Sequence, residues 1–442
     1  MAGRAGARVI DRLLLLGATG DLAGRFLLPA LAELTATGRL PAGLQLVGSA
    51  AEDWDDARFA AHVAARLDEH AGDVPAAARR ALVAAARYRR VDLDVPATVA
   101  AAAGAFDGAG PVAAYLALPP VHFPAAVRAL GAAGLATGSR IAVEKPFGRD
   151  LASARSLNAL LAEATGGQEQ AEFRVDHFLG MPAVAGLLAL RGPLATRWDG
   201  EHIAQVDVVW EETLDAGGRA GFYDRTGALR DVLQNHLVQV LTLLAMELPA
   251  TSAEEDLHRA RLALLRSVRA PAPAATRRAR YTAGPGGPAY TAADGVDPAR
   301  GTETLAELVL TVDTPRWAGT RFVLRTGKAL AADRKQVLLH LRSAAPAECP
   351  PGVERVGDTR LAIPLDGAQR ASAGVRVHAP GERTAYGAVL ADVLSGSSRT
   401  AVSAAEAEEA WRFTDPVSRA WAAGEVPLLE YPAGSAGPPA GR

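Results

Sequence analysis

A glycine turn near the start of the chain restricts the possible folds more than any other feature. Residues 9–17 form an apolar run that ends at a glycine, as a buried parallel strand does. The segment Gly17-Ala18-Thr19-Gly20-Asp21-Leu22 follows, and a helical pattern of leucines begins directly after it. Glycines at such a turn let the backbone approach a pyrophosphate, and the first amides of the helix favour an anion. The order of strand, turn and helix predicts a dinucleotide-binding site, and an ordinary turn without a ligand is the alternative.

Further strands alternate with helices over residues 1–175. The predicted strands lie at 44–48, 112–118 and 139–143, and the predicted alanine-rich helices lie at 55–90 and 97–105. Such alternation produces βαβ units and a parallel sheet. We therefore expect an α/β, Rossmann-like NAD(P)-binding domain in this part of the chain.

The pattern changes after residue 176. Predicted strands now follow one another with few helices between them, at 203–212, 305–313, 320–325, 335–342 and 360–365. One strong helix, 229–247, lies among them. We expect an α+β domain over residues 176–432, built on a large, mainly antiparallel sheet with a helical layer. We expect residues 267–302 to be a long excursion and residues 433–442 to form a tail that frays at its end.

Composition excludes several classes of partner. The 442 residues carry a formal net charge of −2, which supplies no basic field for a nucleic-acid backbone. No stretch approaches the ~18 uncharged apolar residues that span a membrane, and the N-terminus lacks an apolar segment long enough for a secretory signal. The single cysteine, Cys349, excludes an intramolecular disulfide. Together with the lack of a membrane-spanning or secretory segment, the single cysteine leads us to expect a cytoplasmic protein. The nine histidines show no metal-ligand spacing, so we expect no metal.

Lysine is unusually rare in this chain. Of 47 basic residues only Lys145, Lys328 and Lys335 are lysines, and the others are arginines. A chain that uses arginine for its general surface cations retains lysine where a compact ammonium group is needed. The three lysines are therefore functional candidates, with chance retention as the alternative.

Lys145 lies in a segment with a chemical signature. Residues 140–148 read as a strand that ends in Glu144-Lys145-Pro146, and ligands of open α/β sheets bind at such strand ends. The bond between Lys145 and Pro146 is a candidate for the cis isomer, which would fix the direction of the lysine. A surface Glu–Lys pair is the alternative.

Two further segments contain a possible acid–base pair. Asp176 and His177 are adjacent at the end of a predicted strand, and His236 lies within the apolar helix 229–247. A carboxylate beside an imidazole holds its tautomer and raises its basicity, as a general base requires. The sequence leaves open whether Asp176 reaches His236, and a buried structural histidine is the alternative.

These segments, in this order, resemble the glucose-6-phosphate dehydrogenase family. The matching motifs cover nearly the whole chain and lie at Gly17–Arg25, Tyr115–Pro120, Glu144–Gly148, Asp176–Met181, Gln234–Gln239, Arg325–Leu330, Glu409–Arg412 and Tyr431–Ser435. The resemblance implies oxidation of C1 of glucose 6-phosphate to 6-phosphoglucono-δ-lactone, with hydride transfer to NAD or NADP. It also implies a homodimer or a dimer of dimers.

The resemblance implies a role for each matching residue. His236 looks like the base that removes the proton of the C1 hydroxyl, Asp176 like its partner, and Lys145 like a bridge between substrate and nicotinamide. The expected substrate ligands are Lys145, His177, Glu212, Asp231, Lys328 and, after a spacing one residue longer than in the family, Arg334. The expected cofactor ligands are Gly17, Ala18, Thr19, Gly20, Asp21, Leu22, Ser49, Pro119 and Lys145.

The chain departs from the family at the phosphate ligands. The family box that begins at Asp176 ends in lysine and contains a tyrosine, whereas this chain has Met181 and Phe178. The lysine of the first loop is replaced by Gly24. A charge-assisted contact to phosphate contributes ~1.5–3 kcal/mol, so we expect ~10- to 100-fold weaker binding of a phosphosugar unless an arginine compensates.

A second departure concerns the cofactor. The family has an arginine for the NADP 2′-phosphate after the second strand, where this chain has Gly48-Ser49-Ala50-Ala51 followed by Glu52 and Asp53. A carboxylate there hydrogen-bonds a ribose 2′-hydroxyl and repels a phosphate. We therefore expect NAD to be used at least as well as NADP. Recruitment of Arg58 to the site is the alternative.

Three other functions remain open. The loss of phosphate ligands allows a dehydrogenase of another hexose or aminosugar, phosphorylated or not, in a specialised pathway. The protein could instead be an inactive homologue that acts as a binding partner, which the retained His236, Asp176 and Lys145 oppose. The last alternative is membership of the wider group of sugar oxidoreductases that share Glu-Lys-Pro after a Rossmann strand, and the helix around His236 argues against that alternative.

Overall fold

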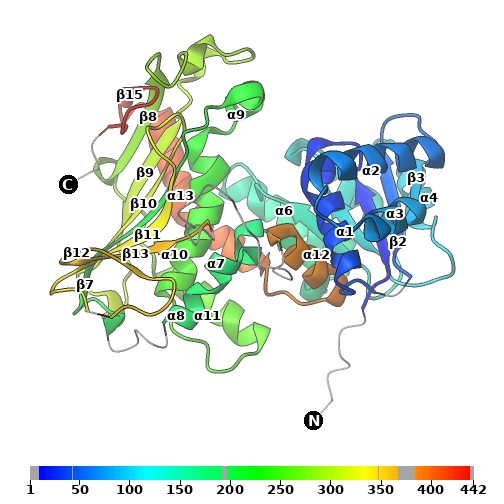
Figure 1. Ribbon diagram of the computed structural model, residues 1–442, viewed down its shortest axis with the longest axis horizontal. Coiled ribbons are helices and arrows are strands. Elements are labelled where there is room, and N and C mark those ends of the chain that lie inside the picture. Colours follow the sequence, from blue (N-terminus) through cyan, green and yellow to red (C-terminus); the bar gives the residue numbers. More distant parts are fainter. Residues whose placement is uncertain (1–8, 42, 192–196, 347, 367–383, 439–442) are drawn as a thin grey trace. The chain divides into compact units, whose positions relative to one another are not determined.

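The structure is a computed structural model that describes residues 9–41, 43–191, 197–346, 348–366 and 384–438 (Figure 1). Its contacts divide the chain into two compact units. The first consists of residues 1–182 with 378–407, and the second of residues 183–377 with 408–442. No helix within the described ranges combines the length and hydropathy that crossing a bilayer requires.

The first unit contains a seven-stranded sheet in the order β14-β6-β5-β4-β1-β2-β3. Every neighbouring pair is parallel except β14 and β6. The strands are β1 (Arg12–Leu16), β2 (Gln45–Ala50), β3 (Ala86–Arg90), β4 (Ala113–Leu116), β5 (Arg140–Glu144), β6 (Glu172–Val175) and β14 (Ala401–Val402). All five residues of β1 are buried, because helices cover both faces of the sheet. This architecture is the predicted Rossmann-like domain.

The helices of this unit form two packed groups. One group comprises π-helix η1 (Ala23–Leu27), α1 (Leu28–Ala36), α2 (Asp56–His70), α3 (Ala76–Ala85) and α12 (Ala385–Ser395). The other comprises α4 (Pro96–Ala103), α5 (Phe123–Ala132) and α6 (Leu151–Ala164). Side chains define the helix starts: Asp55 accepts a hydrogen bond from the amide of Arg58, and Asp150 and Ser153 form a capping box.

Two expectations about this unit need correction. The predicted helical segment 55–90 ends in a strand, since β3 pairs with β2 and alternates buried with partly exposed side chains. Residues 384–407, expected in the second domain, belong to the first unit. The reason is that α12 packs on α1 and that β14 extends the sheet beyond β6. The guanidinium of Arg140 fixes the end of α12 by donating to the carbonyl oxygens of Val393 and Leu394.

The second unit contains an eight-stranded sheet in the order β12-β13-β11-β7-β10-β9-β8-β15. Its pairs are antiparallel except β7 with β10 and β8 with β15, as expected for a mainly antiparallel sheet. The strands are β7 (Ile203–Glu211), β8 (Thr276–Thr282), β9 (Leu305–Leu310), β10 (Arg321–Gly327), β11 (Arg334–Leu341), β12 (Glu354–Gly357), β13 (Arg360–Pro364) and β15 (Leu428–Pro432). Strand β8 lies inside the expected excursion 267–302, and β15 was not predicted.

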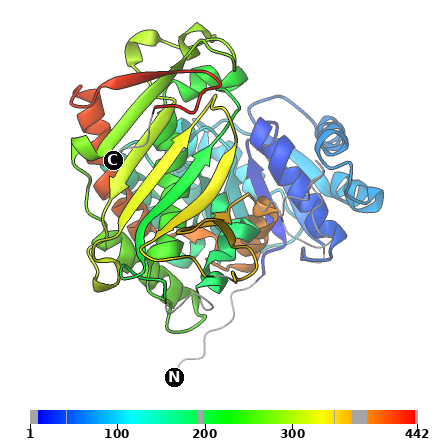
Figure 2. The ribbon, with the colours of Figure 1, turned by 60° about the vertical axis from the view of Figure 1, so that its left-hand side comes forward.

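Helices cover one face of this sheet, as Figure 2 shows. The helices are α8 (Leu187–Leu190), α9 (Ala220–Tyr223), π-helix η7 (Leu229–Leu237), α10 (Val238–Ala245) and α11 (Glu254–Ser267), with α13 (Ala404–Ala422) running from one unit into the other. η7 and α10 form the continuous helix predicted over 229–247, and η7 packs on β7, β9 and β10. On the covered face Val208 lies opposite Leu324 and Val337, and all three are almost completely buried.

The expected tail does not fray within its described part. The amide of Gly434 donates to the carbonyl oxygen of Ala329, and the amide of Ala331 donates to that of Ser435. The side chain of Arg325 donates to the carbonyl oxygens of Ala436 and Pro438. These contacts hold the chain end against the sheet of the second unit up to Pro438.

Candidate active site

The predicted glycine turn joins β1 to η1 between two other strand ends. Gly17 has φ of 85°, and a Cβ atom there would lie 2.3 Å from the carbonyl oxygen of Ala117, just after β4. Its amide and that of Ala18 donate to the carbonyl oxygen of Ser49 in β2, at 2.7 and 3.1 Å. Only glycine fits at position 17, which keeps the turn short and places the following helix start at the strand ends. Such a turn suits the pyrophosphate of a dinucleotide.

The end of β2 brings one carboxylate to this turn. The hydroxyl of Thr19 donates to both carboxylate oxygens of Glu52, at 3.2 Å. The hydroxyl of Tyr88 holds the backbone of Glu52 at 2.8 Å. Glu52 is thus an acidic residue from the end of β2 that the structure holds beside the glycine turn. Gly48, by contrast, makes room for the ring of Phe59, which a Cβ atom would approach to 2.2 Å.

Two arginines flank the same loop. The guanidinium of Arg58, the cation considered from the sequence, lies 4.9 Å from the centre of the Trp54 ring. Arg90, which we did not single out, donates from Nε to the carbonyl oxygen of Ala51 at 3.2 Å. It was missed because β3 was expected to be helical. Trp54 and Arg90 also help to line an open pocket of about 460 Å³.

Lys145 follows β5, and the bond between Lys145 and Pro146 is cis, as expected. The residue before it has an unexpected environment. Glu144 is 6% exposed and accepts a 2.5 Å hydrogen bond from the hydroxyl of the fully buried Tyr115. Burial raises the pKa of Glu144 to about 7, although Tyr115 and the ammonium of Lys145 oppose the rise.

Asp176 and His177 follow β6 at the same edge of the sheet. Asp176 is fully buried, and its Oδ1 accepts a 3.0 Å hydrogen bond from the amide of Phe178. The ring of His177 stacks on Tyr386 of α12, with 5.0 Å between centroids and a 17° interplanar angle. The hydroxyl of Tyr386 lies 3.5 Å from Nδ1 of His177. Tyr386 supplies a hydroxyl beside His177, and its distance in sequence kept it from being predicted.

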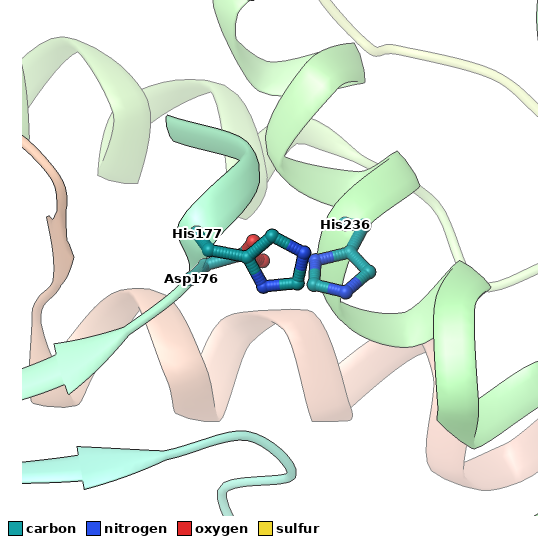
Figure 3. Close-up of side chains that lie close together, drawn as sticks. All are labelled: Asp176, His177 and His236. Carbon is teal, nitrogen blue, oxygen red and sulfur yellow. The ribbon is translucent and has the colours of Figure 1, made fainter. Parts of the chain in front are cut away.

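His236 and Asp231 lie on η7 in the second unit. His236 is 3% exposed. The helix begins at Leu229, whose amide donates to the carboxylate of Glu303 at 3.0 Å. Burial raises the pKa of Glu303. A π-helix widens the backbone and often occurs at functional sites. Figure 3 shows the side chains of Asp176, His177 and His236. Carboxylates and imidazoles are also the side-chain groups that commonly bind metal ions.

The predicted substrate ligands Glu212 and Lys328 meet at one end of the second sheet. Glu212 follows β7, Lys328 follows β10, and Nζ of Lys328 lies 2.8 Å from Oε2 of Glu212. The ammonium of Lys328 also lies 5.7 Å from the centre of the Tyr223 ring. A second ammonium, that of Lys335, lies 3.7 Å from Oε1 of the same carboxylate.

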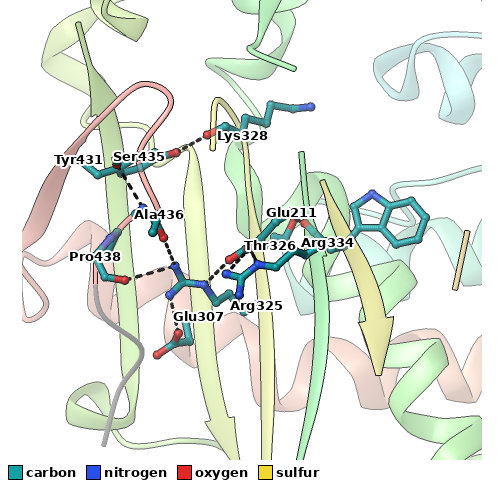
Figure 4. Close-up of polar contacts among 12 residues, drawn as sticks. Glu211, Glu307, Arg325, Thr326, Lys328, Arg334, Tyr431, Ser435, Ala436 and Pro438 are labelled. Atoms are coloured by element: carbon teal, nitrogen blue, oxygen red, sulfur yellow. Dashed lines mark hydrogen bonds and ion pairs between the residues drawn. The ribbon is translucent and has the colours of Figure 1, made fainter. Parts of the chain in front are cut away.

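Arg334 is not part of this group. Its Nε donates to Oε2 of Glu211 at 2.6 Å, and the other oxygen of Glu211 accepts from Nε of Arg325 at 2.6 Å. Arg325 also pairs with the buried Glu307 at 2.8 Å (Figure 4). The structure thus places this expected substrate ligand in a separate ion-pair network.

The first unit gathers the expected cofactor residues around the carboxyl ends of parallel strands. The glycine turn follows β1, Ser49 lies near the end of β2, Pro119 follows β4, and Lys145 follows β5. In open α/β sheets this edge binds the ligand. The residues therefore fit a dinucleotide, which would lie over the glycine turn and supply a hydride acceptor.

The sequence matches one family over nearly its whole length. Residues 14–185 match the NAD binding domain of glucose-6-phosphate dehydrogenase, and residues 193–384 and 371–442 match its C-terminal domain. Glucose-6-phosphate 1-dehydrogenase 2 of Mycobacterium bovis is 34% identical, with 96% of this chain and 91% of the relative covered. The enzyme of Mycolicibacterium smegmatis is 33% identical, with 96% and 93% covered.

Solved structures show the same similarity. A glucose-6-phosphate dehydrogenase in complex with its substrate glucose 6-phosphate matches with a TM-score of 0.84 and 25% identity, covering 98% of this chain and 96% of the other. Glucose-6-phosphate 1-dehydrogenase from Mycobacterium avium matches with a TM-score of 0.80 and 29% identity, with the same coverage. The 3-ketoreductase KijD10 from Actinomadura kijaniata, at 15% identity, a TM-score of 0.52 and coverage of 95% and 99%, shares only the fold.

Proposed function

This chain belongs to the glucose-6-phosphate dehydrogenase family, and from that membership we propose that it oxidises C1 of glucose 6-phosphate to 6-phosphoglucono-δ-lactone and reduces NAD(P)+. The observation that carries the proposal is the similarity, over 98% of the chain, to a solved dehydrogenase with bound glucose 6-phosphate. The chain is accordingly an NAD(P)-dependent dehydrogenase that acts on a CH–OH group. The polar residues of the family motifs are retained at Glu144–Gly148 and Gln234–Gln239.

The proposed mechanism uses three side chains. His236 removes the proton of the C1 hydroxyl as the hydride leaves C1 for the bound nicotinamide. Asp176 orients the imidazole and stabilises the imidazolium that forms. Lys145 lies at the end of β5, where its ammonium can hold a substrate hydroxyl near the cofactor. Asp176 and His236 are both buried, which supports these roles. The attraction between a carboxylate and an imidazolium is screened less by solvent when both groups are buried.

A substitution at His236 tests this mechanism. Asn retains the size and polarity of the side chain but cannot accept the proton, so H236N should lower kcat ~100-fold or more with little change in KM. The substitution H258N on α11 is the control and should leave kcat unchanged. Near-wild-type turnover of H236N would refute the assignment of the base.

We propose that NAD is used at least as well as NADP. Glu52 supports this, because the hydroxyl of Thr19 holds its carboxylate at the glycine turn, where a ribose 2′-hydroxyl would be accepted and a 2′-phosphate repelled. The kcat/KM values for both cofactors test the proposal. E52Q should raise kcat/KM for NADP more than for NAD, with E69Q on α2 as the control. A wild-type preference for NADP above tenfold would contradict it, and R58Q and R90Q would then identify the responsible cation.

A different sugar is the second candidate function. Phe178 and Met181 favour it, since they remove a hydroxyl and a cation that the family directs at phosphate. The hydroxyl of Tyr386 next to His177 partly offsets that loss. A steady-state panel of glucose, glucosamine and their 6-phosphates separates the two functions. A kcat/KM for a free sugar equal to that for its 6-phosphate would favour the second candidate.

We also propose that the protein is a homodimer or a dimer of dimers, acts in the cytoplasm and binds a small-molecule sugar as its substrate. The family membership supports the assembly, and a single cysteine fits a reducing compartment. Light scattering of the purified protein tests the assembly. A monomer at micromolar concentration would contradict it.

A further inference from the structure

The third lysine of the chain, Lys335, has no role in the family motifs. It is the second residue of β11, where it lies opposite Trp210 of β7. Its preceding residue, Arg334, lies opposite Glu211. Because successive side chains of a strand point to opposite faces of the sheet, Arg334 and Lys335 cannot serve the same site.

The register shows which face each residue occupies. Lys335, Val337 and Leu339 alternate along β11, and Val337 and Leu339 are buried under the helical layer. Lys335 therefore points to the covered face, on which η7 packs against β7, β9 and β10. η7 carries Asp231 and His236. Lys335 thus lies on the side of the sheet that carries the proposed chemistry.

The contacts of Lys335 agree with this placement. Its ammonium and that of Lys328 contact different oxygens of one carboxylate, Glu212, at 3.7 and 2.8 Å. The side chains of Lys328 and Lys335 are 15% and 18% exposed, and the ammonium of Lys335 also lies 5.0 Å from the centre of the Trp210 ring. Among the described residues, both lysines form their ion pairs with the same carboxylate, that of Glu212.

Arg334 is committed to the other face. It shares Glu211 with Arg325, and Arg325 continues the network to Glu307 and to the carbonyl oxygens of the chain end (Figure 4). Glu211 and Glu307 are 1% exposed, so both need these cations to offset the cost of burial. A role for Arg334 at the substrate would leave Glu211 with one fewer partner.

We propose that Lys335, and not Arg334, is the second cation of the substrate site, and that Lys328 and Lys335 together bind the phosphate of an anionic sugar. The proposal rests on the proposed function, since it takes a sugar phosphate as the ligand. Two ammonium groups that share one carboxylate form a compact cationic pair, which binds a phosphate more strongly than a neutral hydroxyl.

The test compares K335Q with R334Q. K335Q should raise KM for glucose 6-phosphate ~10- to 100-fold, weaken competitive inhibition by inorganic phosphate in parallel, and change kcat and the turnover of free glucose little. R334Q should leave KM within about twofold and lower the melting temperature. K335R, which retains the charge, should recover most of the affinity, whereas a purely structural role would not separate K335Q from K335R by charge.

The outcomes distinguish the two proposals. An unchanged KM in K335Q, or a KM that rises in R334Q instead, overturns the assignment of Lys335. If K335Q does not fold, K335M, which keeps the stem over Trp210, replaces it. A wild-type enzyme that treats glucose and glucose 6-phosphate alike and is not inhibited by phosphate would refute the proposed substrate itself, whatever the variants do.

Discussion

At the end of β5, the carboxyl group of Glu144 is buried against the hydroxyl of Tyr115. The charged groups that face it are Lys145 on the next residue and Asp176 at the end of β6, and Tyr386 of α12 faces Tyr115. Burial raises the pKa of Glu144 to about 7, from an ordinary 4.5. Between these two values the folded protein binds more protons than the unfolded chain, so the contribution of Glu144 to stability is greatest at low pH and decreases as the pH rises through about 7.

We therefore expect E144Q, which mimics the protonated acid and still accepts from Tyr115, to remove this pH dependence. Thermal melts at pH 5 and pH 7.5 should show a smaller loss of melting temperature in E144Q than in the wild type, by ~2–4 °C or more. E163Q, an exposed position on α6, should melt like the wild type at both values. Equal pH dependence of E144Q and wild type would show that Glu144 ionises normally.

The sequence indicated Lys145, Asp176 and His177 at strand ends because each lies at the end of a segment with a strand pattern. It could not indicate the environment of Glu144, which depends on β4 bringing Tyr115 beside β5. Tyr386 was missed for the same reason, since it lies 209 residues after His177 in the sequence. Contacts between distant segments are set by packing, and no local pattern records them.

At the scale of elements, the ends of β7, β10 and β11 sort their charges by face. Glu212, Lys328 and Lys335 lie on one side, and Glu211, Arg325 and Arg334 lie on the other. The resemblance implied Arg334, at a spacing one residue longer than in the family across the turn that precedes β11, and it carried no information on the face of the sheet that this side chain occupies. Ala329 in that turn has φ of 51°, an unusual conformation for alanine that the sequence does not reveal.

Arg325 is the centre of the second group, so we expect R325M to be strongly destabilising. Removing the guanidinium leaves Glu211 and Glu307 buried with one fewer cation, which costs ~3–5 kcal/mol in comparable buried pairs. Denaturant unfolding measures the difference, with R355M, at an exposed ion pair on β12, as the control. The triple variant E211Q/E307Q/R325M should regain part of the loss, and a lack of recovery would argue against an electrostatic cause.

At the scale of the whole molecule, the order of predicted strands and helices indicated the folds of both domains. It did not indicate that the chain returns to the first unit after most of the second has been formed. Residues 384–407 complete the first unit, because α12 packs on α1 and Ile10 donates to the carbonyl oxygen of Leu394. From the sequence we expected residues 384–407 in the second domain, because a local pattern carries no information on which of the two units a segment joins.

We expect a fragment of residues 9–182 to be poorly stable, since it exposes the edge of β6 and the face of α1 that α12 covers. Joining residues 384–407 to it through a flexible Gly/Ser linker should restore a cooperative thermal transition. Circular dichroism melts of the two fragments measure this. Equal melting temperatures would show that the returning segment adds nothing to the stability of the unit.

This return also sets an order of events during synthesis. The nucleotide-binding half emerges from the ribosome first, but its last strand and covering helix are translated only after most of the substrate-binding half has been made. Until then, an unpaired sheet edge and an apolar helix face stay open to wrong partners. We therefore expect the nascent chain to depend on chaperones that shield its N-terminal half until translation is nearly complete.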